Sequence, residues 1–175
     1  DAWNTVGTTV AGVGVALTAG FGAAVAKSAS FEKSMSSVKA VANASASEMD
    51  ALAEAALEMG AKTAFSASEA AIAQGELARA GVSTADILGG ALQGSMDLAA
   101  AGGLELADAA IISAQAMNLF NLEGKDVGHI ADVLASGANK SAADVSDLGQ
   151  ALGQAGTVAA QTGLSLEETV AALSM

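Results

Sequence analysis

The sequence contains no cysteine, no proline and no tyrosine, and it has only one tryptophan and four phenylalanines. The absence of cysteine excludes a disulfide framework and thiolate chemistry. Aromatic residues make up 3% of the chain, which leaves too few rings for base stacking. A single arginine argues against a phosphate-binding surface, and a single histidine excludes motifs that need a histidine pair. We therefore expect no enzyme, no cofactor and no specific nucleic-acid binding.

Small residues and negative charge dominate what is present. The 175 residues include 45 alanines and 20 glycines, and 19 acidic against seven basic residues give a net charge of −12. Abundant alanine without proline favours helix, so we expect an all-α fold. Alanine buries little apolar area, and the core is therefore expected to be thin. A thin core predicts dependence on a partner or a membrane for full stability.

An uncharged stretch occupies the chain between Asp1 and Lys27. Residues 6–26 are apolar or small over 21 positions, long enough for a helix that crosses a bilayer. Small residues recur in it every four positions, at Thr8, Gly12, Ala16, Gly20 and Ala24. This spacing is typical of close helix contact in lipid, so we predict an oligomer or membrane face here. A buried central helix of an assembly is the alternative interpretation.

A basic, amphipathic segment follows this stretch. Lys27, Lys33 and Lys39 supply three of the seven basic residues, and apolar residues at helical spacing extend the helix to about residue 42. We predict two parts. Residues 1–42 form a long apolar Gly/Ala-rich, membrane-capable helix with a basic C-terminal end. Residues 43–175 form a compact bundle of short capped helices.

Helix-start signals recur throughout the second part. Ser45, Ser66 and Ser165 each precede a glutamate by three residues, and Ser83 and Ser141 each precede an aspartate by three. Glycines that suit helix ends follow at positions 60, 81, 102, 103, 124 and 163. These signals predict helices over residues 47–59, 67–80, 85–101, 105–121, 126–139, 142–162 and from 166 onward. Because the serines are unevenly spaced, we interpret them as reused local chemistry rather than as a repeat.

Two groups of polar residues are candidate sites. One is an acidic row at helical spacing, formed by Asp50, Glu54 and Glu58. A solvated helix face is its simpler interpretation, and a docking surface for a basic patch is the functional one. The other is His129, with Asp126 and Asp132 three residues on either side. Metal binding would need a further ligand, so we expect no metal site.

Several stretches, taken in order, resemble one known family. They are FEKSMSSVKAV (31–41), LAEAALEMGAKTAFSASEAA (52–71), LARAGVSTADIL (77–88), DLAAAG (97–102), ADVLA (131–135) and GLSLEETVAAL (163–173). Together, over about residues 31–175, they resemble the shared helical region of bacteriophage tail tape measure proteins. The uncharged segment before residue 31 is also similar to what that family carries.

The resemblance implies a structural virion protein of the tail lumen or tip. It implies roles in tail assembly, in setting tail length and in genome delivery across the host envelope. The implied partners are tail tube and tail tip proteins, further copies of the chain in a trimer or hexamer, and the host membrane. Frequent caps break the helices, so we expect the length-measuring part to lie elsewhere in a longer parent chain. Two alternatives remain open: a membrane-active or pore-forming protein of non-viral origin, and a purely soluble helical scaffold.

Overall fold

The computed structural model describes residues 27–175, and every regular element in that part of the chain is a helix. Residues 27–41 are helical and lead into α2 (Ala46–Lys62) and α3 (Ala67–Arg79). The remaining elements are α4 (Thr84–Asp86), a π-helical segment (Ile87–Ala91), α5 (Leu92–Gly102), α6 (Leu106–Phe120), a 3-10 turn (Gly124–Asp126), α7 (Val127–Lys140), α8 (Val145–Gln161) and α9 (Leu166–Leu173). The predicted all-α class is confirmed.

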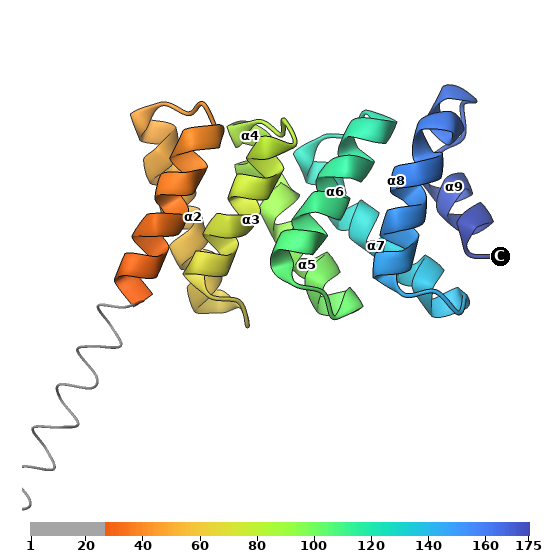
Figure 1. The fold of residues 1–175 in the computed structure, drawn as a ribbon, viewed down its shortest axis with the longest axis horizontal. Helices are drawn as coiled ribbons and strands as arrows, with labels where there is room; N and C mark the ends of the chain where they lie inside the picture. The colour runs from red at the N-terminus through yellow and green to blue at the C-terminus, as the bar shows by residue number, and fades with distance from the viewer. Residues whose placement is uncertain (1–26) are drawn as a thin grey trace, which may run out of the picture.

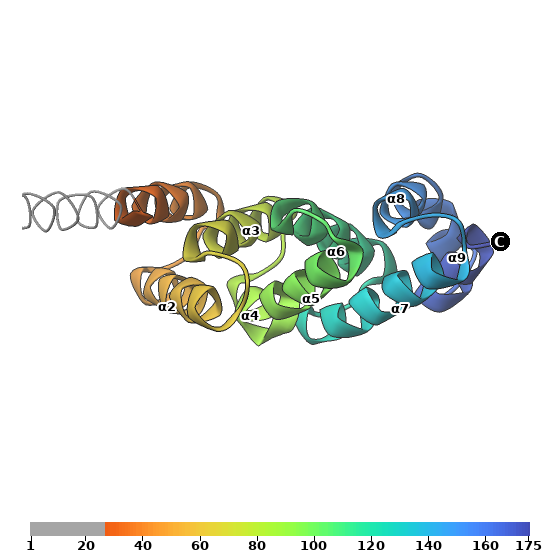
Figure 2. The same cartoon turned by 90° about the horizontal axis from the view of Figure 1, so that it is seen from below.

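The helices alternate between two layers, as Figures 1 and 2 show. Layer A holds the helix of residues 27–41, α3, α6 and α8, and layer B holds α2, the α4–α5 segment, α7 and α9. From α2 onward, each helix packs against its neighbours in its own layer and against a helix of the other layer. The result is an elongated row of helical hairpins. The prediction of a compact bundle was wrong on this point.

The row is built from a repeated helical hairpin. In layer A the N-caps of α3, α6 and α8 are Ser66, Glu105 and Asp144, which follow one another at equal intervals of 39 positions. In layer B the N-caps Ser45, Ser83, Glu123 and Ser165 follow one another at intervals of 38, 40 and 42 positions. Each of these seven N-caps is followed by an acidic residue three positions later. The interpretation of the caps as non-repeating was therefore wrong.

The predicted helix boundaries are close to the observed ones, with three corrections. α2 continues through Gly60 to Lys62 instead of ending at the glycine. The left-handed residue that closes α6 is Asn121, with a φ of 52°, and not the predicted Gly124; α6 itself ends at Phe120. The N-cap of α8 is Asp144 and not Ser141, because the Asp144 carboxylate accepts a hydrogen bond from the backbone N–H of Asp147.

The core runs along the seam between the two layers. Its largest fully buried apolar side chains are Leu52, Leu77, Ile87, Met96, Leu98, Ile130, Leu134, Leu148 and Leu152. Small residues bring the helices close together. A Cβ placed on Gly94 would lie 2.6 Å from the carbonyl carbon of Val127, so α5 and α7 are nearly in backbone contact there. Close approach of this kind compensates for the small side chains of the chain.

The first described helix belongs to the same core. Val38 is 0% exposed, and Phe31 and Met35 pack against the buried cluster. None of the helices between residues 27 and 175 is both long enough and apolar enough to span a bilayer. The predicted membrane-capable segment, residues 6–26, lies outside the described residues, so the division of the chain at residue 42 stays a prediction.

Candidate interaction surfaces

The predicted small-residue face lies outside the part of the chain that the structure describes. Thr8, Gly12, Ala16, Gly20 and Ala24 all precede residue 27. Their role as an oligomer or membrane face stays a prediction.

The acidic row follows one exposed face of α2. Asp50, Glu54 and Glu58 are all exposed, as the solvated-face interpretation expects. The row is not free of basic residues, however, because Lys62 lies one turn beyond Glu58 and forms an ion pair with it. Leu57 lies in the same part of α2, next to Glu58, and its side chain is 53% exposed. A docking role for this face stays a prediction.

His129 connects two helices of layer B. Its Nε2 lies 2.6 Å from Oε1 of Glu167, which joins α7 to the start of α9. The hydrogen bond from His129, followed by a smaller contribution from Ser165, lowers the pKa of Glu167 to about 2. Asp126 points elsewhere and accepts the backbone N–H of Glu123 at 2.9 Å. Within residues 27–175 no three metal-ligating side chains converge. The contact between His129 and Glu167 joins α7 to α9.

Two further polar contacts also join successive repeats. The backbone N–H of Gly124 donates to Oδ1 of Asp86 at 2.9 Å, and Nδ2 of Asn118 donates to the carbonyl oxygen of Ala80 at 2.9 Å. Both contacts join residues 38 positions apart, as does the pair of His129 and Glu167. The carboxylate of Asp86 has a lowered pKa because it is hydrogen-bonded; the bond with Ser83 contributes most, and the bond from the backbone N–H of Gly124 contributes less.

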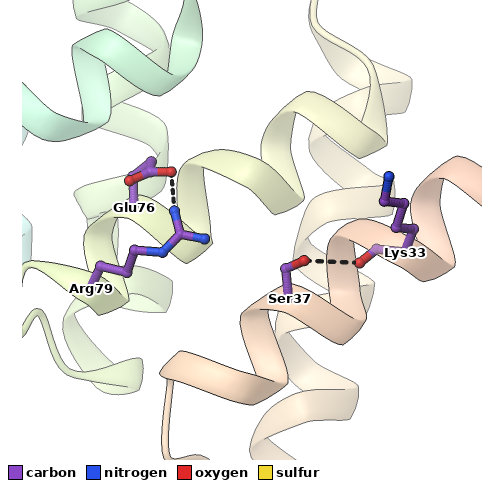
Figure 3. Close-up of polar contacts among 4 residues, drawn as sticks. All are labelled: Lys33, Ser37, Glu76 and Arg79. Atoms are coloured by element: carbon purple, nitrogen blue, oxygen red, sulfur yellow. Dashed lines mark hydrogen bonds and ion pairs between the residues drawn. The ribbon is translucent and has the colours of Figure 1, made fainter.

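A polar groove of about 310 Å³ lies between the helix of residues 27–41 and α3. Lys33 and Arg79 approach it from the two helices (Figure 3). Arg79 forms an ion pair with Glu76 on its own helix, and Oγ of Ser37 donates to the carbonyl oxygen of Lys33 at 3.2 Å. The groove is thus a basic, hydroxyl-rich feature on a protein whose net charge is −12.

A second groove, of about 560 Å³, occupies the equivalent place between α6 and α8. Four residues of the earlier helix line each groove at matching repeat positions. They are Ser30, Lys33, Ser34 and Ser37 in the first groove, and Asp108, Ile111, Ile112 and Gln115 in the second. Each member of the second set lies 78 positions, or two repeats, after its counterpart in the first. The same backbone feature therefore carries different side-chain chemistry along the array.

Layer B carries a more apolar groove of about 430 Å³ between α7 and α9. Val133 and Gly137 line it from α7, and Val170 and Ala171 line it from α9. Asp132, expected beside His129 in the sequence, lines this groove instead. Sequence reasoning missed all three grooves, because each forms between helices that only the repeat brings together.

These features define a class of protein: an elongated two-layer helical repeat with interlocked hairpins and surface grooves, typical of structural and interaction proteins. Residues 53–175 match the family described as phage-related minor tail protein. The chain is 39% identical over 178 residues to the tape measure protein of Pneumococcus phage Dp-1, an alignment that covers 97% of this chain. It is 37% identical over 124 residues to the probable tape measure protein of Escherichia phage P2, which covers 71% of this chain.

The chain belongs to the family of phage tail tape measure proteins, which are structural proteins of the tail. The resemblance seen in the sequence is thereby confirmed. The chain spans about 15% of the length of both relatives. No solved structure matches it.

Proposed function

We propose that this segment is a structural module of a tape measure protein, placed in the tail lumen or tip of the virion. In this role it takes part in tail assembly and tail-length determination, and in delivery of the genome across the host envelope. The observation that carries the proposal is the 39% identity to the Dp-1 tape measure protein across 97% of the chain. Family membership argues against the alternative of a membrane-active protein of non-viral origin.

Within the parent protein, we propose that this module is not the part that measures length. A continuous helix over one repeat interval would extend about 59 Å, at about 1.5 Å per residue. In the folded array, one repeat adds a single helix to each layer, and packed helix axes lie about 8–10 Å apart. A given number of residues therefore spans a distance several times shorter in the array than in a continuous helix. Its grooves and exposed helix faces suit contacts with other proteins.

The partners proposed for the module are tail tube and tail tip proteins, and further copies of the chain in a trimer or hexamer. The acidic face of Asp50, Glu54 and Glu58 is proposed to meet a basic patch on a tail protein. The small-residue face of Thr8, Gly12, Ala16, Gly20 and Ala24 is proposed to join the copies or to enter the host membrane. The module is proposed to have no catalytic activity, because the sequence has no cysteine and only one histidine, which contacts Glu167.

The role is tested by removing one repeat from the parent gene. Deletion of residues 105–143 removes one interval between layer A N-caps, from Glu105 to the residue before Asp144. The remaining helices therefore keep their regular spacing along the chain. We expect tails of unchanged length in electron micrographs. A control deletion of equal length from a long continuous helix elsewhere in the parent chain is expected to shorten the tail by about 59 Å. Equal shortening by both deletions would show that this module is part of the ruler.

The membrane role is tested separately by liposome flotation. A fragment of residues 1–175 and a fragment that begins at Ser28 are mixed with vesicles and centrifuged. We expect only the longer fragment to float, because residues 6–26 supply the apolar stretch. Flotation of neither fragment would limit this stretch to assembly inside the virion.

A further inference from the structure

Two successive layer A helices, α6 and α8, meet where side chains of α6 lie over glycines of α8. Ile112 of α6 lies over Gly149 of α8, where an added Cβ would lie 2.7 Å from its Cδ1. One and two turns further along, Gln115 lies over Gly153 and Leu119 lies over Gly156. Positions 7, 10 and 14 after the N-cap of α6 therefore project onto positions 5, 9 and 12 after the N-cap of α8.

Two of these receiving positions, 5 and 9, hold small residues in all three capped helices of layer A, whereas position 12 varies and is Met117 in α6. Positions 5 and 9 after the N-cap are Ala71 and Gly75 in α3, Ala110 and Ala114 in α6, and Gly149 and Gly153 in α8. Small side chains are needed because the neighbouring helix approaches closely. A helix that receives a neighbour is thus recognisable from its sequence.

The first described helix of the array does not fit this rule. Residue 27 is the equivalent of Ser66, so position 5 of its helix is Glu32, where the three capped helices have alanine or glycine. Positions 9 and 12 are Ser36 and Lys39. All three side chains are exposed, and two of them are long and charged. A polar outer face of this kind is what the terminal helix of a repeat protein requires. Residues 27–41 therefore cap this end of the described array.

The outward face of α8, at the opposite end, is not capped within residues 27–175. Its projecting positions 7, 10 and 14 are Ala151, Gln154 and Val158. Val158 is 63% exposed, whereas Leu119, which holds the same repeat position on α6 and projects onto α8, is half-buried. Among the described residues, Val158 is the most exposed large apolar residue apart from Met175. This face has the composition of an interior contact, but none of the described helices lies on it.

We propose that the face of Ala151, Gln154 and Val158 receives a further layer A helix, supplied by the longer tape measure chain. The repeat places the N-cap of that helix one layer A interval after Asp144. An acidic residue should follow its N-cap by three positions, and alanine or glycine should stand five and nine positions after it. The proposal rests on the repeat and does not depend on the proposed role in the tail.

A second copy of this chain is a poorer occupant. Its exposed end would bring Glu32 to a position where the three capped helices of layer A have alanine or glycine. A long charged side chain at such a position would hold the helices apart and lose its hydration. The relatives, in contrast, have abundant further chain, because the aligned segment covers only 15% of their length.

Cysteine labelling tests the proposal, because the sequence has no cysteine of its own. Val158→Cys is introduced into the full-length chain, with any cysteines outside this segment replaced by serine, and into the 1–175 segment. Maleimide labelling of the introduced thiol is expected to be at least tenfold slower in the full-length chain than in the segment. Ile72→Cys is the matched control, since Ile72 is 44% exposed on α3, and its labelling rate should be the same in both.

Equal labelling at position 158 in both chains would overturn the proposal. Labelling of position 158 in the 1–175 segment that becomes slower as the protein concentration rises would also overturn the proposal. In that case a second copy of the segment would cover Val158. A second readout does not depend on labelling: Val158→Lys should speed amide hydrogen exchange in α8 of the full-length chain and leave exchange in the segment unchanged. The same exchange rate for the Val158→Lys variant and the unaltered full-length chain would count against a covering helix.

Discussion

Single glycines set how closely the layer A helices pack. A Cβ on Gly149 would lie 2.7 Å from Ile112 Cδ1, whereas the nearest atom to a Cβ on Gly153 would be Gln115 Oε1 at 3.4 Å. We predict that Gly149→Ala lowers the free energy of unfolding by about 1–3 kcal/mol through overpacking. Gly153→Ala should raise it by about 0.5–1 kcal/mol, because alanine favours the helix. Urea unfolding followed by circular dichroism measures both, and equal shifts would contradict the packing.

The hydrogen bond between His129 and Glu167 has a measurable consequence for acid stability. The pKa of Glu167 is about 2 in the fold against an ordinary value of 4.5, so its stabilisation is complete above pH 4.5 and is lost as the pH falls towards 2. The side chain is 53% exposed, so this contribution stays below about 1 kcal/mol. We predict that His129→Ala raises the Glu167 pKa towards 4.5 in an NMR titration. His129→Gln, which keeps a donor, should raise it less, and an unchanged pKa in both variants would refute the contact.

At the scale of the element, the joint between α4 and α5 depends on one glycine. Gly90 has a φ of 144°, and a Cβ there would lie 3.1 Å from the carbonyl oxygen of Gly124. We predict that Gly90→Ala lowers the free energy of unfolding by about 1–3 kcal/mol, because alanine is strained at that φ. Gly89→Ala, where a Cβ meets no atom within 4 Å, is the control and should change stability by less than about 1 kcal/mol. Comparable losses in the two variants would contradict the account.

Sequence reasoning predicted the elements well because their ends are set locally. Ser45, Ser66, Ser83 and Ser165 each accept a hydrogen bond from the N–H three residues later, as expected from the sequence. Gly81, Gly103 and Gly163 adopt the predicted left-handed conformation. Two further caps have a different chemistry. Glu105 and Glu123 are N-caps without a serine hydroxyl, and without them the serines alone do not show the interval of about 39 residues between caps.

At the scale of the whole molecule, the sequence could not reveal which helices lie side by side. Lys33 and Arg79 line one groove although they are 46 positions apart, because α3 stacks on the first described helix. His129 meets Glu167 for the same reason, one repeat apart in layer B. The aspartates near His129 in the sequence do not indicate its partner. Asp126 accepts a hydrogen bond at the start of a helix, and Asp132 lines the groove between α7 and α9.

Small-angle X-ray scattering of the monomeric segment of residues 27–175 tests the central claim, an elongated repeat array, most directly. A compact domain of this length has a radius of gyration of about 15 Å. The two-layer row in Figure 1 predicts a clearly larger value and a pair-distance distribution with a long tail. A radius close to the compact value, with a symmetric distribution, would contradict the array and restore the compact bundle.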